Sequence, residues 1–194
     1  MKKLRVMVLM HKELLPPESL EGKTRKEIDE WRTEYDVVST LKQSGHDVLE
    51  LGVGDEVHPI RMGVDEFKPD IVFNLLEAFN GECTYDQNVV AYLELLRQHY
   101  TGCNPRGLTL ARDKALSKKI LNYHRIGVPA FVVFPMGKKI KRPGRLQFPL
   151  IVKSLVEEAS YGISQASVVE NDEKLIERVQ FIHERVGTDA IVEE

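Results

Sequence analysis

The sequence predicts an α/β fold in which an open parallel sheet is followed by a region of different, α+β architecture. In the first half, apolar runs of strand length alternate with amphipathic helical patterns, which is typical of strands joined by right-handed crossover helices. From Pro129 onward, short apolar runs follow one another with a single helical stretch among them. That order favours an antiparallel sheet with its helices on one side.

Four strands are expected in the first half. Leu4–Met10 is a continuous apolar run, as in a central strand covered on both faces. Asp47–Leu51 and Ile71–Asn74 predict the second and third strands, and Tyr100–Gly102 predicts a short fourth strand. The stretch His11–Arg25 lacks periodicity, so it predicts a long loop at a strand end, where function concentrates.

Two helices are expected among these strands, and together they predict a Rossmann-like sheet. The first has apolar side chains at helical spacing, followed by a glycine at the position of a C-terminal cap. Its residues are Trp31, Tyr35, Val38, Leu41 and the capping Gly45. The second helix is marked by Val89, Val90, Leu93 and Leu96.

The composition changes after Cys103. Asn104–Gly107 has the residue types of a turn, which places a domain boundary close to it. The sequence thus predicts two parts, residues 1–106 and residues 107–194.

Two helices are also expected in the second part. Asp113 is a suitable N-cap for the first of them, which ends near Gly127. Its inward side chains are predicted to be Leu116, Ile120 and Leu121. The second helix is expected over Asp172–Arg185.

The stretch Phe148–Ser164 combines an apolar strand, a lysine and a loop. The strand run presents Lys153 at its end, and Tyr161–Ser164 begins what is predicted to be a return strand. A lysine facing a loop of small residues can hold a triphosphate, because the ammonium supplies a point charge and the loop supplies N–H donors. The competing interpretation is an ordinary hairpin with a surface lysine, and spacing alone favours it.

A basic run precedes this stretch, formed by Lys138, Lys139, Lys141, Arg142 and Arg145. Because no aromatic residues are interleaved, a solvated hairpin tip is favoured over a nucleic-acid site. The formal net charge of −3 also gives no reason to expect a nucleic-acid partner.

The composition is that of an ordinary globular protein, with 42% hydrophobic and 29% charged residues. Cys83 and Cys103 are too few for a disulfide framework, and no spacing resembles a zinc site. The basic, apolar N-terminus is too short for a signal peptide, and no window has the length of a membrane span. A cytoplasmic protein without a membrane partner is expected.

Several motifs together resemble the ATP-grasp ligases, and within them the D-alanine–D-alanine ligases. The resemblance extends from about Pro69 to Glu194, and its motifs are VFNLLEAFNGE, YLELLRQHYTGCN, ARDKALSKKILNYHRIGVPAF, FPLIVKSLVEEASYGIS and AIVEE. It implies a Rossmann-like pre-ATP-grasp domain over 1–106 and the first ATP-grasp subdomain over 107–194. A second subdomain, with the Mg²⁺ ligands, is expected beyond these residues, so that no metal ligand is assigned here and this chain alone is expected to be inactive.

The resemblance also implies residues that bind ATP. Lys114 and Lys153 are the two lysines that contact the ATP phosphates. The flap that covers these phosphates is formed by Ala159, Ser160, Tyr161 and Gly162. Glu193 and Glu194 lie at the hinge, which holds the adenine. Lys114 stands in a first helical turn, where a cation opposes the helix dipole, so an anionic partner would explain it. For Glu193, simple solvation at a strand end is the alternative.

The activity implied is the joining of a carboxylate to an amine through an acyl phosphate, with ATP and Mg²⁺ as cofactors and amino acids or peptides as substrates. Where the family places its first substrate, this chain has only the weak candidates Glu13 and Glu18, and Glu77 replaces an imidazole, which suggests a more basic amine. No catalytic residue is assigned. A homodimer is possible on the resemblance.

Two other functions are open. One is a non-catalytic nucleotide-binding or interaction module that keeps half of an ATP-grasp fold. The other is a flavodoxin-like binding domain with an appended hairpin region, which leaves the spacing of Lys114 and Lys153 unexplained.

Overall fold

The computed structural model describes residues 2–157 and 162–194. The chain divides into two compact units, Met1–Leu108 and Thr109–Glu194, called unit 1 and unit 2 below. Each has its own sheet and its own buried core. Within the described residues no helix is both long and apolar enough to span a bilayer.

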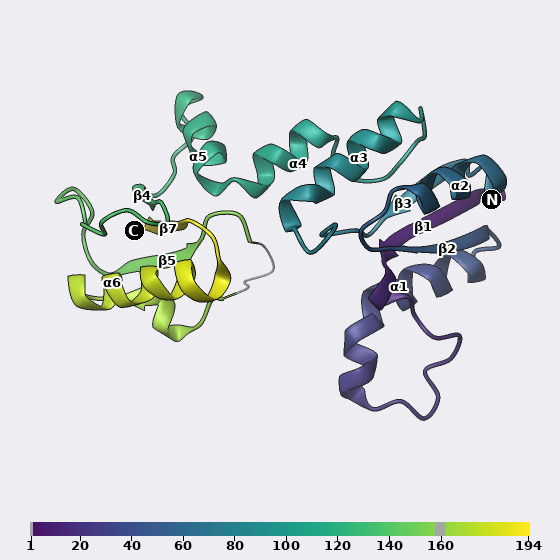
Figure 1. The fold of residues 1–194 in the computed structure, drawn as a ribbon, viewed down its shortest axis with the longest axis horizontal. Coiled ribbons are helices and arrows are strands. Elements are labelled where there is room, and N and C mark those ends of the chain that lie inside the picture. The colour runs from purple at the N-terminus through teal and green to yellow at the C-terminus, as the bar shows by residue number, and fades with distance from the viewer. Residues whose placement is uncertain (1, 158–161) are drawn as a thin grey trace. The chain divides into compact units, whose positions relative to one another are not determined.

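Unit 1 is built on a parallel sheet of three strands in the order β2-β1-β3 (Figure 1). The strands are β1 (Arg5–His11), β2 (Asp47–Val53) and β3 (Ile71–Asn74). Side chains Val6 to Met10 of the central strand are all buried, which explains why this run is apolar without alternation. The predicted open parallel sheet is confirmed.

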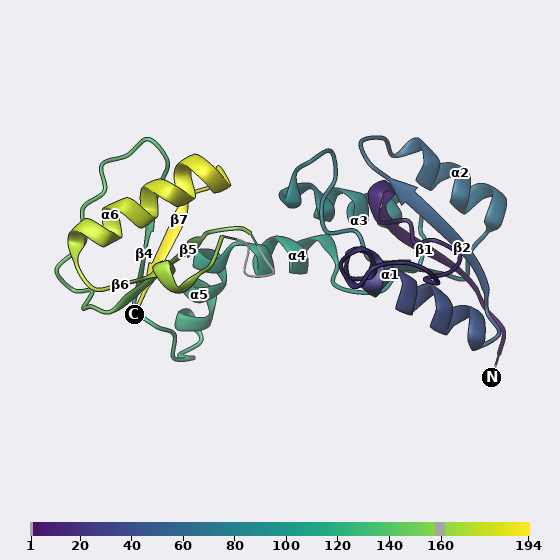
Figure 2. The ribbon, with the colours of Figure 1, turned by 90° about the horizontal axis from the view of Figure 1, so that it is seen from below.

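Helices cover both faces of this sheet (Figure 2). They are α1 (Arg25–Gln43), α2 (His58–Phe67) and α3 (Asp86–Leu95), with short 3₁₀ turns at Lys12–Leu14 and Cys83–Tyr85. Val38 of α1 packs with Val6, Val8 and Met10 on one face. Ile60 of α2 and Leu93 of α3 pack with Met7 and Leu9 on the other.

Two details of unit 1 differ from the sequence-based expectation. The helix α2 was not predicted, because it is short and carries a glycine at its packed face. An added Cβ at Gly63 would lie 2.8 Å from the Met7 sulfur, so close packing on the sheet requires the residue with the poorest helix propensity after proline. Tyr100 forms only an isolated bridge to Val72 and no fourth strand.

The predicted turn at Asn104–Gly107 is wrong, since helix α4 spans Pro105–Arg112. Asn104 acts as its cap, because its Oδ1 accepts a hydrogen bond from the Gly107 N–H at 2.8 Å. Proline is well suited to a first helical position, so the residues that suggested a turn start a helix. The division between the two units falls inside α4.

Unit 2 contains an antiparallel sheet in the order β4-β7-β5-β6. The strands are β4 (Phe131–Phe134), β5 (Leu150–Ser154), β6 (Val168–Val169) and β7 (Ala190–Glu193). The return strand is β6 and not Tyr161–Ser164, of which Tyr161 lies outside the described residues. Ser164 instead caps the 3₁₀ turn Gln165–Ser167, because it exchanges backbone-to-side-chain hydrogen bonds with Ser167.

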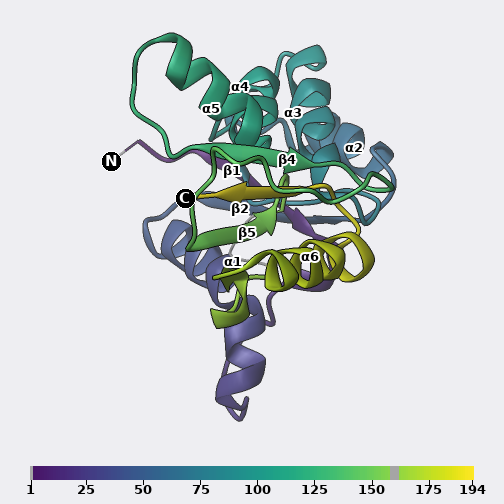
Figure 3. The ribbon, with the colours of Figure 1, turned by 90° about the vertical axis from the view of Figure 1, so that its left-hand side faces the viewer.

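Two helices belong to the sheet of unit 2, and they lie on opposite faces (Figure 3). α6 (Asp172–Phe181), continued by a π turn at Ile182–Val186, packs Leu175 and Val179 against Val152 and Val192. α5 (Lys114–Tyr123) lies on the other face. The expectation of helices on one side only is therefore wrong for unit 2.

The inward side chains predicted for α5 also need correction. Ala115 is the buried one, whereas Ile120 and Leu121 are 37% and 38% exposed. A short helix at the edge of a small sheet has little surface to cover, so part of its apolar face stays open to solvent.

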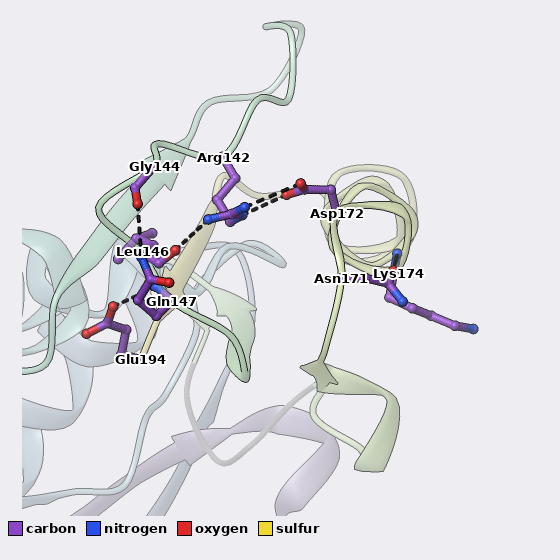
Figure 4. Close-up of polar contacts among 8 residues, drawn as sticks. All are labelled: Arg142, Gly144, Leu146, Gln147, Asn171, Asp172, Lys174 and Glu194. Atoms are coloured by element: carbon purple, nitrogen blue, oxygen red, sulfur yellow. Dashed lines mark hydrogen bonds and ion pairs between the residues drawn. The ribbon is translucent and has the colours of Figure 1, made fainter.

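The basic run lies in the loop between β4 and β5, and Figure 4 shows one of its residues, Arg142. Lys138, Lys139 and Lys141 are exposed, as expected for a solvated loop. Arg142 is different, because its Nε donates to Asp172 Oδ1 at 2.7 Å and its guanidinium stacks 4.6 Å from the Phe148 ring centroid. This arginine has a structural role in holding the loop on the start of α6.

Candidate functional site

The face of the unit 2 sheet that α6 leaves uncovered carries the candidate site. Cross-strand register places Phe131 of β4 and Ile151 of β5 on either side of Glu193 of β7. Side chains alternate between the two faces of a strand, so Lys153, two residues beyond Ile151, points to the same face as Glu193. This face is the one on which α5 lies.

The Glu193 carboxylate is buried between two lysines. Its residue is 4% exposed, and its Oε2 lies 3.2 Å from Lys153 Nζ and 3.4 Å from Lys118 Nζ of α5. A buried carboxylate is costly unless it is paired. Two cations meet that need and leave the cluster with one net positive charge.

Lys114 begins α5 beside the segment that follows β5. Asp113 caps the helix, since its Oδ1 accepts hydrogen bonds from the N–H groups of Ala115 and Leu116 at 3.0 and 2.9 Å. Lys114 Nζ donates to the Glu157 carbonyl oxygen at 2.6 Å and to the Leu155 carbonyl oxygen at 3.4 Å. Its ammonium therefore lies against the chain that leads away from Lys153.

Gly162 is held in a conformation that requires glycine. Its φ is +71°, and an added Cβ would lie 3.0 Å from Val186 Cγ2. Its carbonyl accepts a hydrogen bond from Arg178 of α6. The three residues predicted to precede it in the flap, Ala159, Ser160 and Tyr161, lie outside the described residues.

Arg178 is buried, and desolvation lowers its pKa. Its Nη2 also donates to Ser167 Oγ at 2.9 Å, and its guanidinium lies 4.2 Å from the Phe181 ring centroid. The cation thus ties Gly162 and the following 3₁₀ turn to α6.

Glu194 is exposed and turned away from the lysines. Its Oε1 accepts a hydrogen bond from the Gln147 N–H at 2.8 Å (Figure 4), and its own N–H donates to the Ala130 carbonyl at 3.1 Å. The carboxylate thus fastens the end of β7 to the loop before β5. The prediction for Glu194 concerns its backbone, expected beside the adenine ring, and not its carboxylate.

The substrate candidates lie in unit 1. Glu13 follows β1 with a side chain that is 80% exposed, and Glu77 follows β3 and is also exposed. Because β1 and β3 are parallel neighbours, both residues come from the same edge of the sheet. Glu18 lines a small recess with Tyr35 in the same unit.

Two side chains relevant to the predicted sites were missed in the sequence. Lys118 stands four residues after Lys114, so helical spacing could have placed both on one face of α5. Glu34 lies between Trp31 and Val38 on the apolar face of α1, and the same periodicity marks it as buried. Burial raises the pKa of Glu34, with a smaller contribution from the charge of Glu77.

Within residues 2–157 and 162–194, no group of three or more His, Cys, Asp or Glu side chains could hold a metal ion.

Comparisons with known proteins identify relatives in sequence. A D-alanine–D-alanine ligase of Syntrophotalea carbinolica is 32% identical over 145 residues, which are 74% of this chain and 44% of the relative. A D-alanine–D-alanine ligase of Aquifex aeolicus is 30% identical over 174 residues, which are 90% of this chain and 53% of the relative. The chain therefore spans about half the length of the curated relatives it matches. No protein-family model matches it.

Solved structures agree on the fold. The crystal structure of a D-alanine–D-alanine ligase from Bacillus anthracis complexed with ATP superposes with a TM-score of 0.71 at 21% identity, over 98% of this chain and 58% of that one. A D-Ala:D-Ser ligase from Enterococcus faecalis gives a TM-score of 0.65 at 20% identity, over 100% of this chain and 63% of that one. At such identities the likeness concerns the fold.

Proposed function

Since the chain has an ATP-grasp, D-alanine–D-alanine ligase-like fold, we propose that it carries the nucleotide-binding half of an ATP-dependent carboxylate–amine ligase. Unit 1 is then the Rossmann-like pre-ATP-grasp domain, and unit 2 is the first ATP-grasp subdomain. The cytoplasmic location and the homodimer expected for the protein remain predictions.

One observation carries the proposal. Lys153 and Glu193 come from different strands and lie 3.2 Å apart on the sheet face that α6 does not cover. Lys114, from a helix, reaches the segment just beyond the same strand β5. These three residues thus lie along one strand, β5, with Glu193 opposite Ile151 near its start and Lys114 beyond its end. That arrangement supports the proposal, because an ordinary hairpin with a surface lysine would not require it.

Each residue has a proposed role. Lys114 and Lys153 neutralise charge on the ATP phosphates, and Glu193 accepts an N–H from the adenine amino group. The backbone of Glu194 lies beside the base. Ala159, Ser160, Tyr161 and Gly162 supply N–H donors above the phosphates.

The proposed reaction has two steps. A substrate carboxylate attacks the γ-phosphorus of ATP, which forms an acyl phosphate and releases ADP. The nitrogen of a neutral amine then attacks the acyl carbon, the bond to phosphate breaks, and the nitrogen loses a proton to give the amide. Positioning and charge neutralisation account for most catalysis of this kind, and those are the tasks assigned to the two lysines.

The substrates proposed are an amino acid or peptide carboxylate and an amine. Glu13 and Glu77, at the same edge of the unit 1 sheet, are the candidates for contact with them. Magnesium accompanies ATP in the proposal for the whole protein, but no residue described here is assigned to it.

The test is nucleotide binding and turnover by the full natural protein. Lys153→Met removes the ammonium and keeps most of the stem, so it is expected to weaken ATP binding about tenfold or more, the worth of one charge-assisted hydrogen bond. Calorimetry measures the binding, and ATP-dependent phosphate release across amino acid and peptide pairs measures the activity. Lys139→Met, at an exposed lysine of the same unit, is the matched control.

Unchanged ATP affinity in Lys153→Met would contradict the proposal. ATP binding without phosphate release for any carboxylate and amine pair would instead favour the non-catalytic nucleotide-binding module.

A further inference from the structure

Lys118 and Lys153, the two lysines beside Glu193, differ in whether the proposed function gives them a second partner. Both contact Oε2, Lys153 at 3.2 Å and Lys118 at 3.4 Å. Lys153 is assigned to phosphate in the proposed function, and an ammonium that reaches a phosphate relaxes its hold on the carboxylate. Lys118 has no such second task, and its side chain is the less exposed, at 16% against 25%.

The other carboxylate oxygen is open to a ligand. Among residues 2–157 and 162–194, Glu193 Oε1 accepts no hydrogen bond, although the side chain is only 6% exposed. Glu193 Oε1 is not among the described side-chain atoms that are both fully buried and without a partner. It therefore keeps contact with solvent, and a ligand that brings an N–H group can reach it.

We propose that Lys118 is the permanent counter-ion of Glu193, a positioning residue that makes the nucleotide site select a base with an exocyclic amino group. The inference rests on the proposed function. The Glu193 carboxylate accepts hydrogen bonds and donates none. Lys118 offsets the charge of that carboxylate. It also fixes Oε2, so that Oε1 faces the ligand.

This arrangement also explains how Lys153 can serve the phosphates. If Lys153 were the sole partner of Glu193, its departure would leave a buried charge unpaired, at a large cost. With Lys118 in place the carboxylate stays paired. The Phe131 ring, cross-strand neighbour of Glu193, has its centroid 6.0 Å from Lys118 Nζ and helps to hold that ammonium in place.

The experiment compares two probes on the full natural protein: ATP, and purine riboside triphosphate, which lacks the amino group. The unaltered protein is expected to prefer ATP by about tenfold, as for one hydrogen bond to a charged group. Lys118→Met is expected to lose most of that preference, while Lys118→Arg retains it. Lys119→Met, at the exposed neighbour on α5, is the matched control and should retain it as well.

A double variant separates positioning from general damage. Glu193→Gln alone should lose the preference, and Lys118→Met combined with Glu193→Gln should lose no more, because the counter-ion then has no carboxylate to serve. The double variant leaves no unpaired buried carboxylate, so it remains informative if Lys118→Met alone folds poorly.

The outcomes are distinct. An unaltered protein that binds no nucleotide overturns both the proposed function and this inference. A protein that binds ATP without preferring it over purine riboside triphosphate overturns the inference alone. The inference alone is also overturned if Lys118→Met retains the preference for ATP. It is likewise overturned if the double variant loses more of that preference than Glu193→Gln does.

Discussion

Glu34 and Glu193 show two ways in which a folded chain can bury a carboxylate. Glu193 lies between Lys118 and Lys153, within 3.4 Å of each. Glu34, 7% exposed on α1, forms no ion pair within the described part of the chain, and burial raises its pKa. The first arrangement holds a charge ready for a ligand, whereas the second holds a carboxyl group whose charged form the fold disfavours.

Replacing Glu34 by glutamine tests that difference. A raised carboxyl pKa means that the folded state binds the proton more tightly than the unfolded state. Above the folded-state pKa the native chain therefore bears the full cost of the buried charge, and Glu34→Gln should raise the free energy of unfolding by about 1 kcal/mol. The gain should shrink as the pH falls through that pKa and vanish below the ordinary value of 4.5.

Urea unfolding at a series of pH values measures this gain. Glu30→Gln, at an exposed position on the same helix, is the control and should show almost no change. A gain of equal size at every pH would exclude the titration of Glu34 as its cause.

Among the elements, α5 decides the geometry of the candidate site, because it carries both Lys114 and Lys118. Its start is determined by Asp113, which was recognised in the sequence as an N-cap. α6 has an equivalent cap, Asn171, whose Oδ1 accepts a hydrogen bond from the Lys174 N–H at 2.9 Å (Figure 4). The two helices lie on opposite faces of one sheet and so form a matched pair.

Removal of each cap should separate stability from binding. Asp113→Ala and Asn171→Ala are each expected to lower the free energy of unfolding by about 1 kcal/mol. Asp113→Ala should also weaken ATP binding, since the first turn of α5 positions Lys114, whereas Asn171→Ala should leave the affinity unchanged. Thermal unfolding and calorimetry measure the two effects. Equal losses of ATP affinity in both variants would argue against a special role for α5.

At the scale of the whole molecule, the chain has two units with separate cores. Unit 1 places its core on both faces of a parallel sheet, and unit 2 places its main core between α6 and one face of an antiparallel sheet. Each core is closed within its own unit, so the loss of one is expected to leave the other folded.

Core truncations test that independence. Leu175→Ala, at a position 1% exposed under α6, should cost about 2–5 kcal/mol. Hydrogen exchange followed by mass spectrometry should then show faster exchange in unit 2 and unchanged protection of β1. Leu93→Ala, in the core of unit 1, is the reciprocal control. Faster exchange in both units from either variant would mean that the chain unfolds as one cooperative block.

The sequence by itself determined most of the strands and helices, because apolar periodicity follows directly from which faces are buried. Leu4–Met10 and Ile71–Asn74 were found in this way, as was the cap at Asp113. Two short helices were not predicted. In α2, Gly63 is required for close packing but lowers the helix propensity, and α4 begins with residues typical of a turn, Asn104–Gly107.

Only the tertiary structure decided which charges meet. Strand register placed Lys153 beside Glu193, and the face that α5 covers brought Lys118 to the same carboxylate. Neither contact follows from spacing along the chain, because both join residues far apart in the sequence. Their separation in space depends on how the strands of the sheet are paired. The physical reason is that periodicity records burial, whereas the pairing of charges depends on long-range geometry.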